Sequence, residues 1–183
     1  MFDCLNMSAK GQDAGKSVLI IGGVGSVAIQ LAEHVAKLQV IAMASRPESA
    51  QWAEELGADH IVNHFEDIPK QMKAIGFAQV DYVLIFNDTD KHFPSAEVIK
   101  PQGGICSIVE NARPLQVELL KQKSGAFHWE WMYTRSMFTT PDMIEQHKLL
   151  SEAARLIDAA NLRETHRLLE EGRAIGKLVL TGF

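Results

Sequence analysis

One short stretch, Ser17 to Lys37 (SVLIIGGVGSVAIQLAEHVAK), constrains the fold more than any other part of the chain. It opens with an unbroken apolar run, Val18 to Ile21, which is typical of a strand buried on both faces of a parallel sheet. A glycine turn follows at Gly22, Gly23 and Gly25. After the turn, apolar residues recur at roughly helical spacing: Val27, Ile29, Leu31, Ala32 and Val35. Strand, glycine turn and helix form the opening unit of a dinucleotide-binding βαβ fold.

This turn is the predicted pyrophosphate site. The start of a helix offers unpaired N–H groups and a positive dipole end, and glycine lets a phosphate approach the backbone closely. We therefore expect the three glycines and the amides of Val24 and Ser26 to surround the pyrophosphate. Only part of the usual G-x-G-x-x-G spacing is present, and the loop is about two residues short of that fingerprint. The alternative is a tight strand-to-helix turn that binds no ligand.

Length and composition restrict the class of protein. A chain of 183 residues suits one domain, or one domain with a small appendage, and 46% hydrophobic residues are enough for a core. The net charge of −5, without a basic cluster, argues against a nucleic-acid surface. No apolar run approaches the ~20 residues of a membrane helix, and no signal peptide opens the chain. Cys4 and Cys106 are interpreted as two inert thiols in a reducing cytoplasm. The protein is expected to be cytoplasmic and to have no membrane partner.

Further strands and helices alternate along the chain. Apolar runs predict strands at Val40 to Ala44, Ile61 to Val62, Val80 to Phe86 and Ile105 to Val109. Helical patterns lie between them, at Pro47 to Leu56, Glu66 to Ile75 and Ser95 to Ile99. This alternation predicts an α/β fold with a doubly wound parallel sheet covered on both faces. Ser45 and Glu48 have the spacing of a capping box at the start of the helix that Gly57 ends.

The last third of the chain has a different pattern. The aromatic stretch from Phe127 to Arg135 is interpreted as a sixth strand in a half-buried or interface position. A long amphipathic helix is expected over Met143 to Ala159, and a second one, capped by Asn161, reaches Glu171. An apolar strand, Gly176 to Leu180, closes the chain.

The end of the second strand predicts which dinucleotide binds. A carboxylate that binds the adenosine ribose of NAD lies about 20 residues past the glycines in such folds. Here Ser45 and Arg46 hold that place, and a guanidinium there can pair with a 2′-phosphate. This favours NADPH over NADH. The alternatives are that Ser45 only caps a helix and that Arg46 is an ordinary surface residue.

Polar side chains follow the fourth strand at its carboxyl end, where ligands gather in open α/β sheets. Asn87, Thr89 and Asp90 are therefore candidates to contact ribose hydroxyls or the nicotinamide. Equally, asparagine and aspartate are good loop formers without any ligand.

Metal and nucleophile chemistry find little support in the sequence. His60 and His64 are four residues apart, which on a strand separates them by ~13 Å, and no cysteine cluster supplies partners. Zinc held by this chain is not expected. No Ser/His/Asp or Cys/His arrangement is recognisable, so we name no catalytic residue.

Seven segments together resemble a known superfamily. They are VLIIGGVGSVAIQLA, ASRPES, LGADHIVNH, VDYVLIFNDTDKHF, PQGGICSI, HWEWMYTRSMFTTPDMIEQ and GRAIGKLVL. Over nearly the whole chain they are similar to the cofactor half of the medium-chain dehydrogenase/reductases. The branch they resemble is that of the zinc-type alcohol dehydrogenase-like proteins, relatives of quinone oxidoreductases.

The resemblance implies a Rossmann domain with six parallel strands. Such relatives transfer a hydride from NADPH to a small-molecule substrate, an activated C=C bond, a quinone or a carbonyl, and many of them lack catalytic zinc. Members often form homodimers through the sixth strand, which would be Phe127 to Tyr133 here. An oxidoreductase cofactor domain is thus expected, and a non-catalytic dinucleotide-binding or sensing module, or an inactive fragment, is the alternative.

The resemblance also implies that parts of the parent protein are missing. The β-rich catalytic domain of the family is not recognisable, nor is the stretch that usually separates the helix near Ala159 from Asn161. We therefore expect a fragment that is inactive alone. Residues 1–159 would form the NAD(P)-binding Rossmann domain, and residues 160–183 a helix and strand that return to the missing domain.

Overall fold

The structure, a computed structural model, describes residues 13–22 and 25–156. It divides into two compact units, Met1–Glu130 and Trp131–Phe183. The predicted domain boundary after residue 159, the helix from Asn161 and the strand to Leu180 lie outside the described residues. No helix within the two described ranges is long and apolar enough to cross a membrane.

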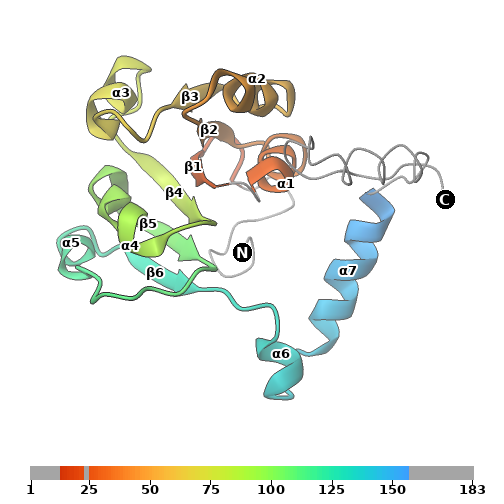
Figure 1. Cartoon of the computed structure of the whole chain (residues 1–183). Helices are drawn as coiled ribbons and strands as arrows, with labels where there is room; N and C mark the ends of the chain where they lie inside the picture. Colours follow the sequence, from red (N-terminus) through yellow and green to blue (C-terminus); the bar gives the residue numbers. More distant parts are fainter. Residues whose placement is uncertain (1–12, 23–24, 157–183) are drawn as a thin grey trace. The chain divides into compact units, whose positions relative to one another are not determined.

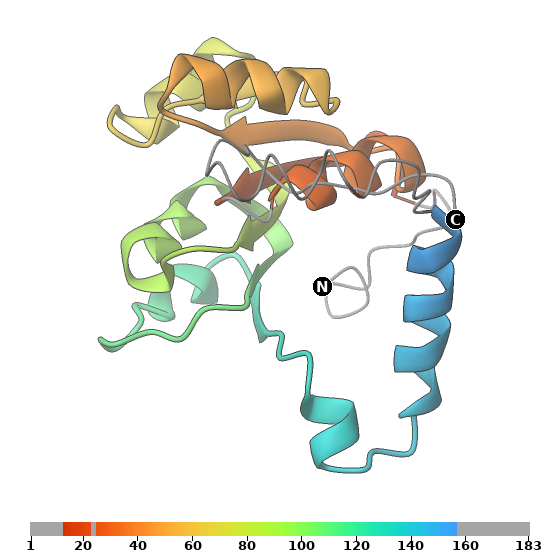
Figure 2. The same ribbon diagram turned by 45° about the vertical axis from the view of Figure 1, so that its right-hand side comes forward.

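The first unit contains a parallel sheet of six strands, in the order β3-β2-β1-β4-β5-β6. Figure 1 shows this order from β3 at the top to β6 at the bottom, and Figure 2 shows β1 and β2 side by side. The strands are β1 (Ser17–Ile21), β2 (Gln39–Met43), β3 (His60–Val62), β4 (Val80–Ile85), β5 (Ile99–Ser107) and β6 (Ala126–Trp129). The predicted doubly wound α/β sheet is confirmed, with the strand order of a Rossmann fold.

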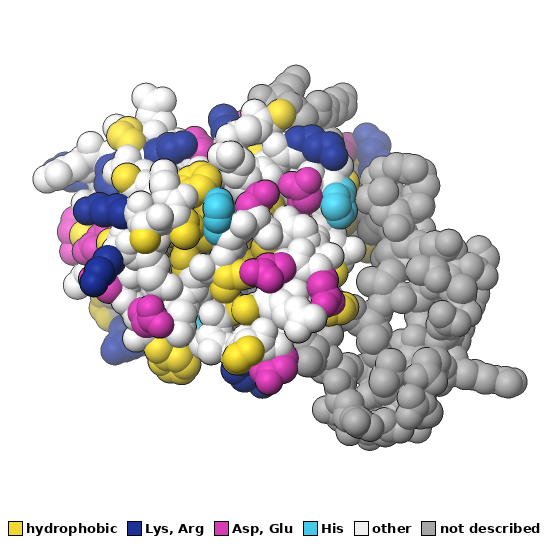
Figure 3. Space-filling view, turned by 90° about the horizontal axis from the view of Figure 1, so that it is seen from above, with side chains coloured by type: hydrophobic (Ala, Val, Ile, Leu, Met, Phe, Trp, Pro, Cys, Tyr) yellow, Lys and Arg dark blue, Asp and Glu magenta, His cyan; other side chains and the backbone are white. Residues whose placement is uncertain are grey.

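Helices connect consecutive strands. In the first unit they are α1 (Gly25–Gln30) with its π-helical continuation η1 (Leu31–Val35), α2 (Pro47–Glu55), α3 (Ile68–Ala74), α4 (Thr89–His92), the 3₁₀ helix η2 (Phe93–Val98) and α5 (Glu118–Lys121). The second unit contains α6 (Thr134–Met137) and α7 (Ile144–Leu156). Side chains of both charge signs are interspersed on the face of the first unit that Figure 3 shows.

The core forms two layers, one on each face of the sheet. Val18 and Ile20 of β1 belong to one cluster, to which α1 and α2 contribute alanines and Ile29. Leu19 and Ile21 belong to the other cluster, with residues of α3, η2 and α5. Successive side chains of a strand point to opposite faces, so a strand covered on both sides must be apolar throughout. This explains the unbroken apolar run of β1.

The predicted capping box of α2 is wrong. Arg46, not Ser45, is the N-cap residue, with φ −107° and ψ 142°, and no side chain caps the helix. Pro47 is the reason, because a residue before proline is driven into an extended conformation and therefore cannot be helical. The end of the helix is as predicted, since Gly57 has φ +104°, a value that glycine adopts without strain.

β5 begins earlier than the sequence pattern predicted. It starts at Ile99, and its pairing with β4 shifts register between Val80 and Tyr82. A Cβ atom on Gly103 would lie 2.7 Å from the main-chain oxygen of Asp81. The glycine-rich segment therefore lets the two strands approach closely inside the sheet and is not a turn before β5.

β6 is shorter than predicted. It ends at Trp129, and the N–H of Glu130 donates to the main-chain oxygen of Ser107 at 2.9 Å. The aromatic alternation that predicted a strand to Arg135 continues on exposed residues of a turn before α6. The strand prediction failed because bulky residues on a surface turn have the same alternation as a half-buried strand.

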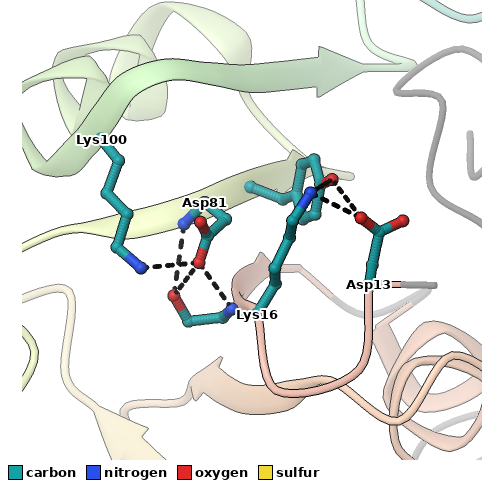
Figure 4. A network of polar contacts seen from close by, with 6 residues as sticks. Asp13, Lys16, Asp81 and Lys100 are labelled. Atoms are coloured by element: carbon teal, nitrogen blue, oxygen red, sulfur yellow. Dashed lines mark hydrogen bonds and ion pairs between the residues drawn. The ribbon is translucent and has the colours of Figure 1, made fainter. Parts of the chain in front are cut away.

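Asp81 connects the amino ends of β1 and β4. Its Oδ2 accepts hydrogen bonds from the Ser17 N–H and Oγ, both at 2.8 Å, and pairs with Lys100 Nζ at 2.7 Å (Figure 4). Burial raises the pKa of this carboxyl, but the bonds from Lys100 and Ser17 outweigh it and lower the pKa. The Lys16 Nζ donates to Tyr82 Oη at 3.1 Å and pairs with Asp13 at 2.5 Å beside it.

We predict that Asp81→Asn lowers the free energy of unfolding by about 1–3 kcal/mol, because a neutral amide removes the counter-charge of Lys100 and weakens the charge-assisted bonds to Oδ2. Urea unfolding at neutral pH measures this. Glu54→Gln, on the exposed side of α2, is the matched control and should change stability by less than about 0.5 kcal/mol. Equal effects of both substitutions would contradict a special role for Asp81.

Candidate functional site

The carboxyl ends of the six parallel strands lie at one edge of the sheet. Consecutive strands are added outward from β1 on one side, as β2 and β3, and then outward from β4 on the other side, as β5 and β6. The order of the strands therefore switches direction between β1 and β4. Ligands of open α/β sheets bind in the crevice at such a switch point. Gly22 follows β1 there and Asn87 closely follows β4, so the predicted site residues lie at the expected edge.

Gly22 and Asn87 are in close contact at this switch point. Gly22 has φ +106°, and a Cβ atom added to it would lie 3.0 Å from the Cβ of Asn87. The N–H of Phe86 donates to the main-chain oxygen of Ile21 at 2.8 Å and holds the two strand ends together. Only glycine fits here without strain, because its φ is positive and a side chain on it would collide with Asn87. Gly23 and Val24 lie outside the described residues.

Gly25 and Ser26 form the first turn of α1. The Gly25 N–H donates to the main-chain oxygen of Gly22 at 2.9 Å, and a Cβ on Gly25 would lie 3.0 Å from Ile20 Cγ2. Ser26 is buried, and its hydroxyl accepts a hydrogen bond from Trp52 Nε1 at 3.1 Å. The hydroxyl thus fixes α1 against α2. The sequence pattern gave no sign of the contribution of Trp52.

Ser45 and Arg46 follow the end of β2, which pairs with β1 through Met43 and Ile21. The Arg46 side chain is exposed, and no carboxylate of the described ranges forms an ion pair with it. The main-chain oxygen of Arg46 accepts the first hydrogen bond of α2 from Ala50 at 3.0 Å. The structure therefore places Arg46 beyond the end of β2, with no carboxylate partner from residues 13–22 or 25–156.

Asn87, Thr89 and Asp90 have three different environments. Asn87 is exposed, and its Oδ1 accepts from the N–H of Asp88 at 2.8 Å. Thr89 is fully buried, and its hydroxyl contacts the hydroxyl of Ser107 at 2.6 Å. Asn87 is thus the one of the three whose side chain is exposed at the edge.

The carboxylate of Asp90 is occupied by main-chain donors. It accepts the N–H of Ala112 at 2.7 Å and that of Arg113 at 3.1 Å. It therefore anchors the loop after β5. Ser107, at the end of that strand, is a buried polar residue that the sequence analysis missed, because a serine at a strand end has no pattern of its own.

Two histidines, His64 after β3 and His92 in α4, have rings that face each other. The ring centroids of His64 and His92 are 6.1 Å apart, and His92 is buried. Burial, with the nearby charge of Lys91, lowers the pKa of His92 to about 4 and also lowers the pKa of His64. Within the described residues no three histidine, cysteine, aspartate or glutamate side chains are grouped so that they could hold a metal ion.

We predict that the free energy of unfolding falls as the pH decreases from about 6.5 to about 4, by roughly 3 kcal/mol at most from His92. The unfolded chain binds a proton near pH 6.5, whereas folded His92 resists protonation until about pH 4, so acid favours the unfolded state. Urea unfolding at a series of pH values measures the slope.

His92→Gln should flatten this pH dependence. His147→Gln, at an exposed position of α7, serves as its control and should leave the slope as it is. An unchanged slope in His92→Gln would contradict the assignment to this buried imidazole.

Comparisons with known proteins agree with the fold. A family model described as zinc-binding dehydrogenase matches residues 23–144. A zinc-type alcohol dehydrogenase-like protein of Staphylococcus aureus (strain MSSA476) is 38% identical over 200 residues, which cover 98% of this chain and 59% of that relative. The chain thus spans 59% of the length of this relative.

Solved structures give the same result. A protein of Rhizobium etli CFN 42, described as a zinc-dependent alcohol dehydrogenase, superposes with a TM-score of 0.78 at 37% identity, covering 100% of this chain and 59% of that one. The quinone oxidoreductase of Thermus thermophilus, whose structure is also known in complex with NADPH, has a TM-score of 0.55 at 26% identity, over 73% of this chain and 42% of its own.

Proposed function

The chain belongs to the zinc-binding dehydrogenase family, and we propose that its cofactor-binding domain holds NADPH across the crevice between β1 and β4 for hydride transfer. One observation carries this proposal. At the switch point β1 ends on Gly22, which packs against the exposed Asn87, and Arg46, whose guanidinium has no carboxylate partner among the described residues, lies beyond the neighbouring strand. The NADPH complex of the Thermus thermophilus quinone oxidoreductase, a 26% identical protein, supports the choice of cofactor.

We assign the pyrophosphate to the turn after β1. Gly22 and Gly25 have no side chains that would block its approach, and the amides at the start of α1 and the dipole of the helix favour an anion. Gly23, Val24 and the amide of Ser26 complete the proposed cradle. The burial of the Ser26 hydroxyl against Trp52 keeps the first turn of the helix in place.

We assign the 2′-phosphate of NADPH to Arg46 and Ser45. A guanidinium forms charge-assisted, bidentate hydrogen bonds with phosphate, and the neighbouring hydroxyl can donate one more. No acidic side chain occupies the position at which NAD-binding folds hold the ribose hydroxyls. The site is therefore built for a phosphorylated ribose rather than for NADH.

Asn87 is assigned to the ribose or nicotinamide on the β4 side, because its side chain is exposed beside Gly22. Thr89 and Asp90 are engaged in contacts within the fold and shape the loop after β5. NADPH supplies a hydride, and an activated C=C bond, a quinone or a carbonyl of a small molecule would accept it. The described residues bind and orient the cofactor. Substrate contacts are assigned to the part of the relatives that lies outside this chain.

We predict that Arg46→Ala weakens NADPH binding about 10- to 100-fold and leaves NADH binding unchanged, because it removes one charge-assisted contact to the 2′-phosphate. Isothermal titration calorimetry with both cofactors measures this. Lys73→Ala, which removes an exposed cation from α3, is the control and should bind NADPH like the wild type.

Equal affinities of the wild type for NADPH and NADH would refute the 2′-phosphate assignment. If neither cofactor binds, the alternative of a fragment with an inactive turn holds. If NADPH binds but a full-length relative of this chain shows no turnover with quinones, enones or carbonyls, a non-catalytic sensing module is the better interpretation.

We further propose that two copies of the chain pair through β6. This strand lies at the end of the sheet order and pairs on one side with β5, so its other edge has no strand partner among the described residues. Trp129 on it is 49% exposed and packs edge-on against Phe127 at 4.9 Å. An edge strand with exposed apolar side chains readily pairs with a second strand.

Trp129→Lys should therefore weaken dimerisation at least about 10-fold, since a charge on the pairing edge opposes association. Sedimentation equilibrium over a range of protein concentrations measures the dissociation constant. Phe65→Lys makes the same change at another exposed aromatic residue and should leave association as it is. A wild-type chain that stays monomeric at high concentration would contradict pairing through β6.

A further inference from the structure

We propose that Thr89 is a positioning residue whose buried hydroxyl fixes the turn after β5 against the nicotinamide half of the crevice. The inference rests on the proposed NADPH site and adds a residue that controls how one half of the cofactor is held. It differs from the expectation that Thr89 touches the ligand, because Thr89 is fully buried.

Two hydroxyls connect three segments at the carboxyl edge. Thr89, the first residue of α4, donates from Oγ1 to the main-chain oxygen of Val109, and its Oγ1 lies 2.6 Å from the Oγ of Ser107. Ser107 is the last residue of β5, and its Oγ accepts the N–H of Val109 at 3.3 Å. The start of α4, the end of β5 and the turn beyond it are thus joined in one small network.

The Thr89 hydroxyl is the side-chain group of this network that connects α4 to the turn. A hydroxyl has one proton to donate. Thr89 gives its proton to the carbonyl of Val109, so the hydroxyl of Ser107 donates to Thr89 Oγ1. Both side chains have 0% exposure, so bulk water does not reach either hydroxyl. Ser107 Oγ also lies 3.4 Å from the main-chain oxygens of Ile85 and Val109. Loss of the Thr89 hydroxyl would therefore leave the turn these longer contacts and remove its side-chain link to the start of α4.

The turn lies where the nicotinamide half of a dinucleotide would be. In a doubly wound sheet each half of the fold binds one mononucleotide, and Arg46 assigns the adenosine half to the β1–β2 side. The other half therefore lies over β4 and β5. The N–H of Ile108 donates to the main-chain oxygen of Ile85 at 3.3 Å, so the turn runs along the end of β4, close to Asn87. Ile108 itself is 39% exposed.

Asp90 extends the same arrangement. Its carboxylate accepts the N–H groups of Ala112 and Arg113, farther along the loop after β5. The first two residues of α4 thus hold this loop at two places, Thr89 at its start and Asp90 near its middle. Because one short helix holds the loop at two places, the loop presents a fixed surface to a nicotinamide ring bound over β4. A surface that is fixed before binding lowers the entropic cost of ordering that ring.

The test compares binding of NADPH with binding of 2′,5′-ADP, which has the adenosine and the 2′-phosphate but no nicotinamide. In the wild type, NADPH should bind more tightly than 2′,5′-ADP. Thr89→Val keeps the shape of the side chain and removes the hydroxyl. We expect it to weaken NADPH binding about 10-fold and to change 2′,5′-ADP binding less than about twofold. Thr89→Ser keeps the hydroxyl and should restore NADPH binding.

The outcomes separate this inference from the proposed function. If the wild type binds neither compound, the proposed NADPH site itself is wrong. If the wild type binds both equally, or if Thr89→Val weakens both equally or neither, the positioning role is refuted while the site remains. A Thr89→Val chain that shows no cooperative thermal unfolding also overturns the inference, because the hydroxyl is then needed for the fold as a whole.

Discussion

The fold depends on the burial of β1 on both faces of the sheet. Val18 and Ile20 anchor the helices of one layer, and Leu19 and Ile21 those of the other, so both cores are built on this strand. β1 also pairs with β2 on one side and β4 on the other, which makes it the strand at which the topology reverses. The strand that organises the core therefore also opens the crevice at its carboxyl end.

The two ends of β1 have opposite chemistry. At the amino end, the carboxylate of Asp81 satisfies the donors of Ser17 and Lys100 and fixes β1 against β4. At the carboxyl end, the same two strands are held by main-chain contacts, and Gly22 lets Asn87 pack directly against the backbone. A charged side chain with its hydrogen bonds satisfied holds the first end, whereas main-chain hydrogen bonds and the contact of Gly22 with Asn87 hold the second.

The residues after β4 and β5 show that buried side chains without ligand contacts can fix the loop beside a candidate site. The sequence placed Thr89 and Asp90 at the correct edge of the sheet, because the carboxyl ends of parallel strands meet there. It did not reveal that both side chains point into contacts with the loop after β5. Such contacts join residues far apart in the sequence, and neither residue type nor spacing contains that information.

The sequence by itself determined the parallel α/β sheet, the strand–glycine–helix unit and the position of Arg46 after β2. These features depend on the spacing of apolar residues and on turn residues, and both involve only residues close together in the sequence. The predicted cap of α2 at Ser45 was wrong because Pro47 makes Arg46, the residue before it, the N-cap. The predicted strand beyond Trp129 was wrong because exposed aromatic residues in a turn alternate like those of a strand. Only the tertiary structure decided that Asn87 packs on Gly22, that Trp52 holds Ser26 and that two buried hydroxyls fix the loop after β5. These features arise where strands distant in the sequence are brought together by burial, and burial is a property of the whole chain.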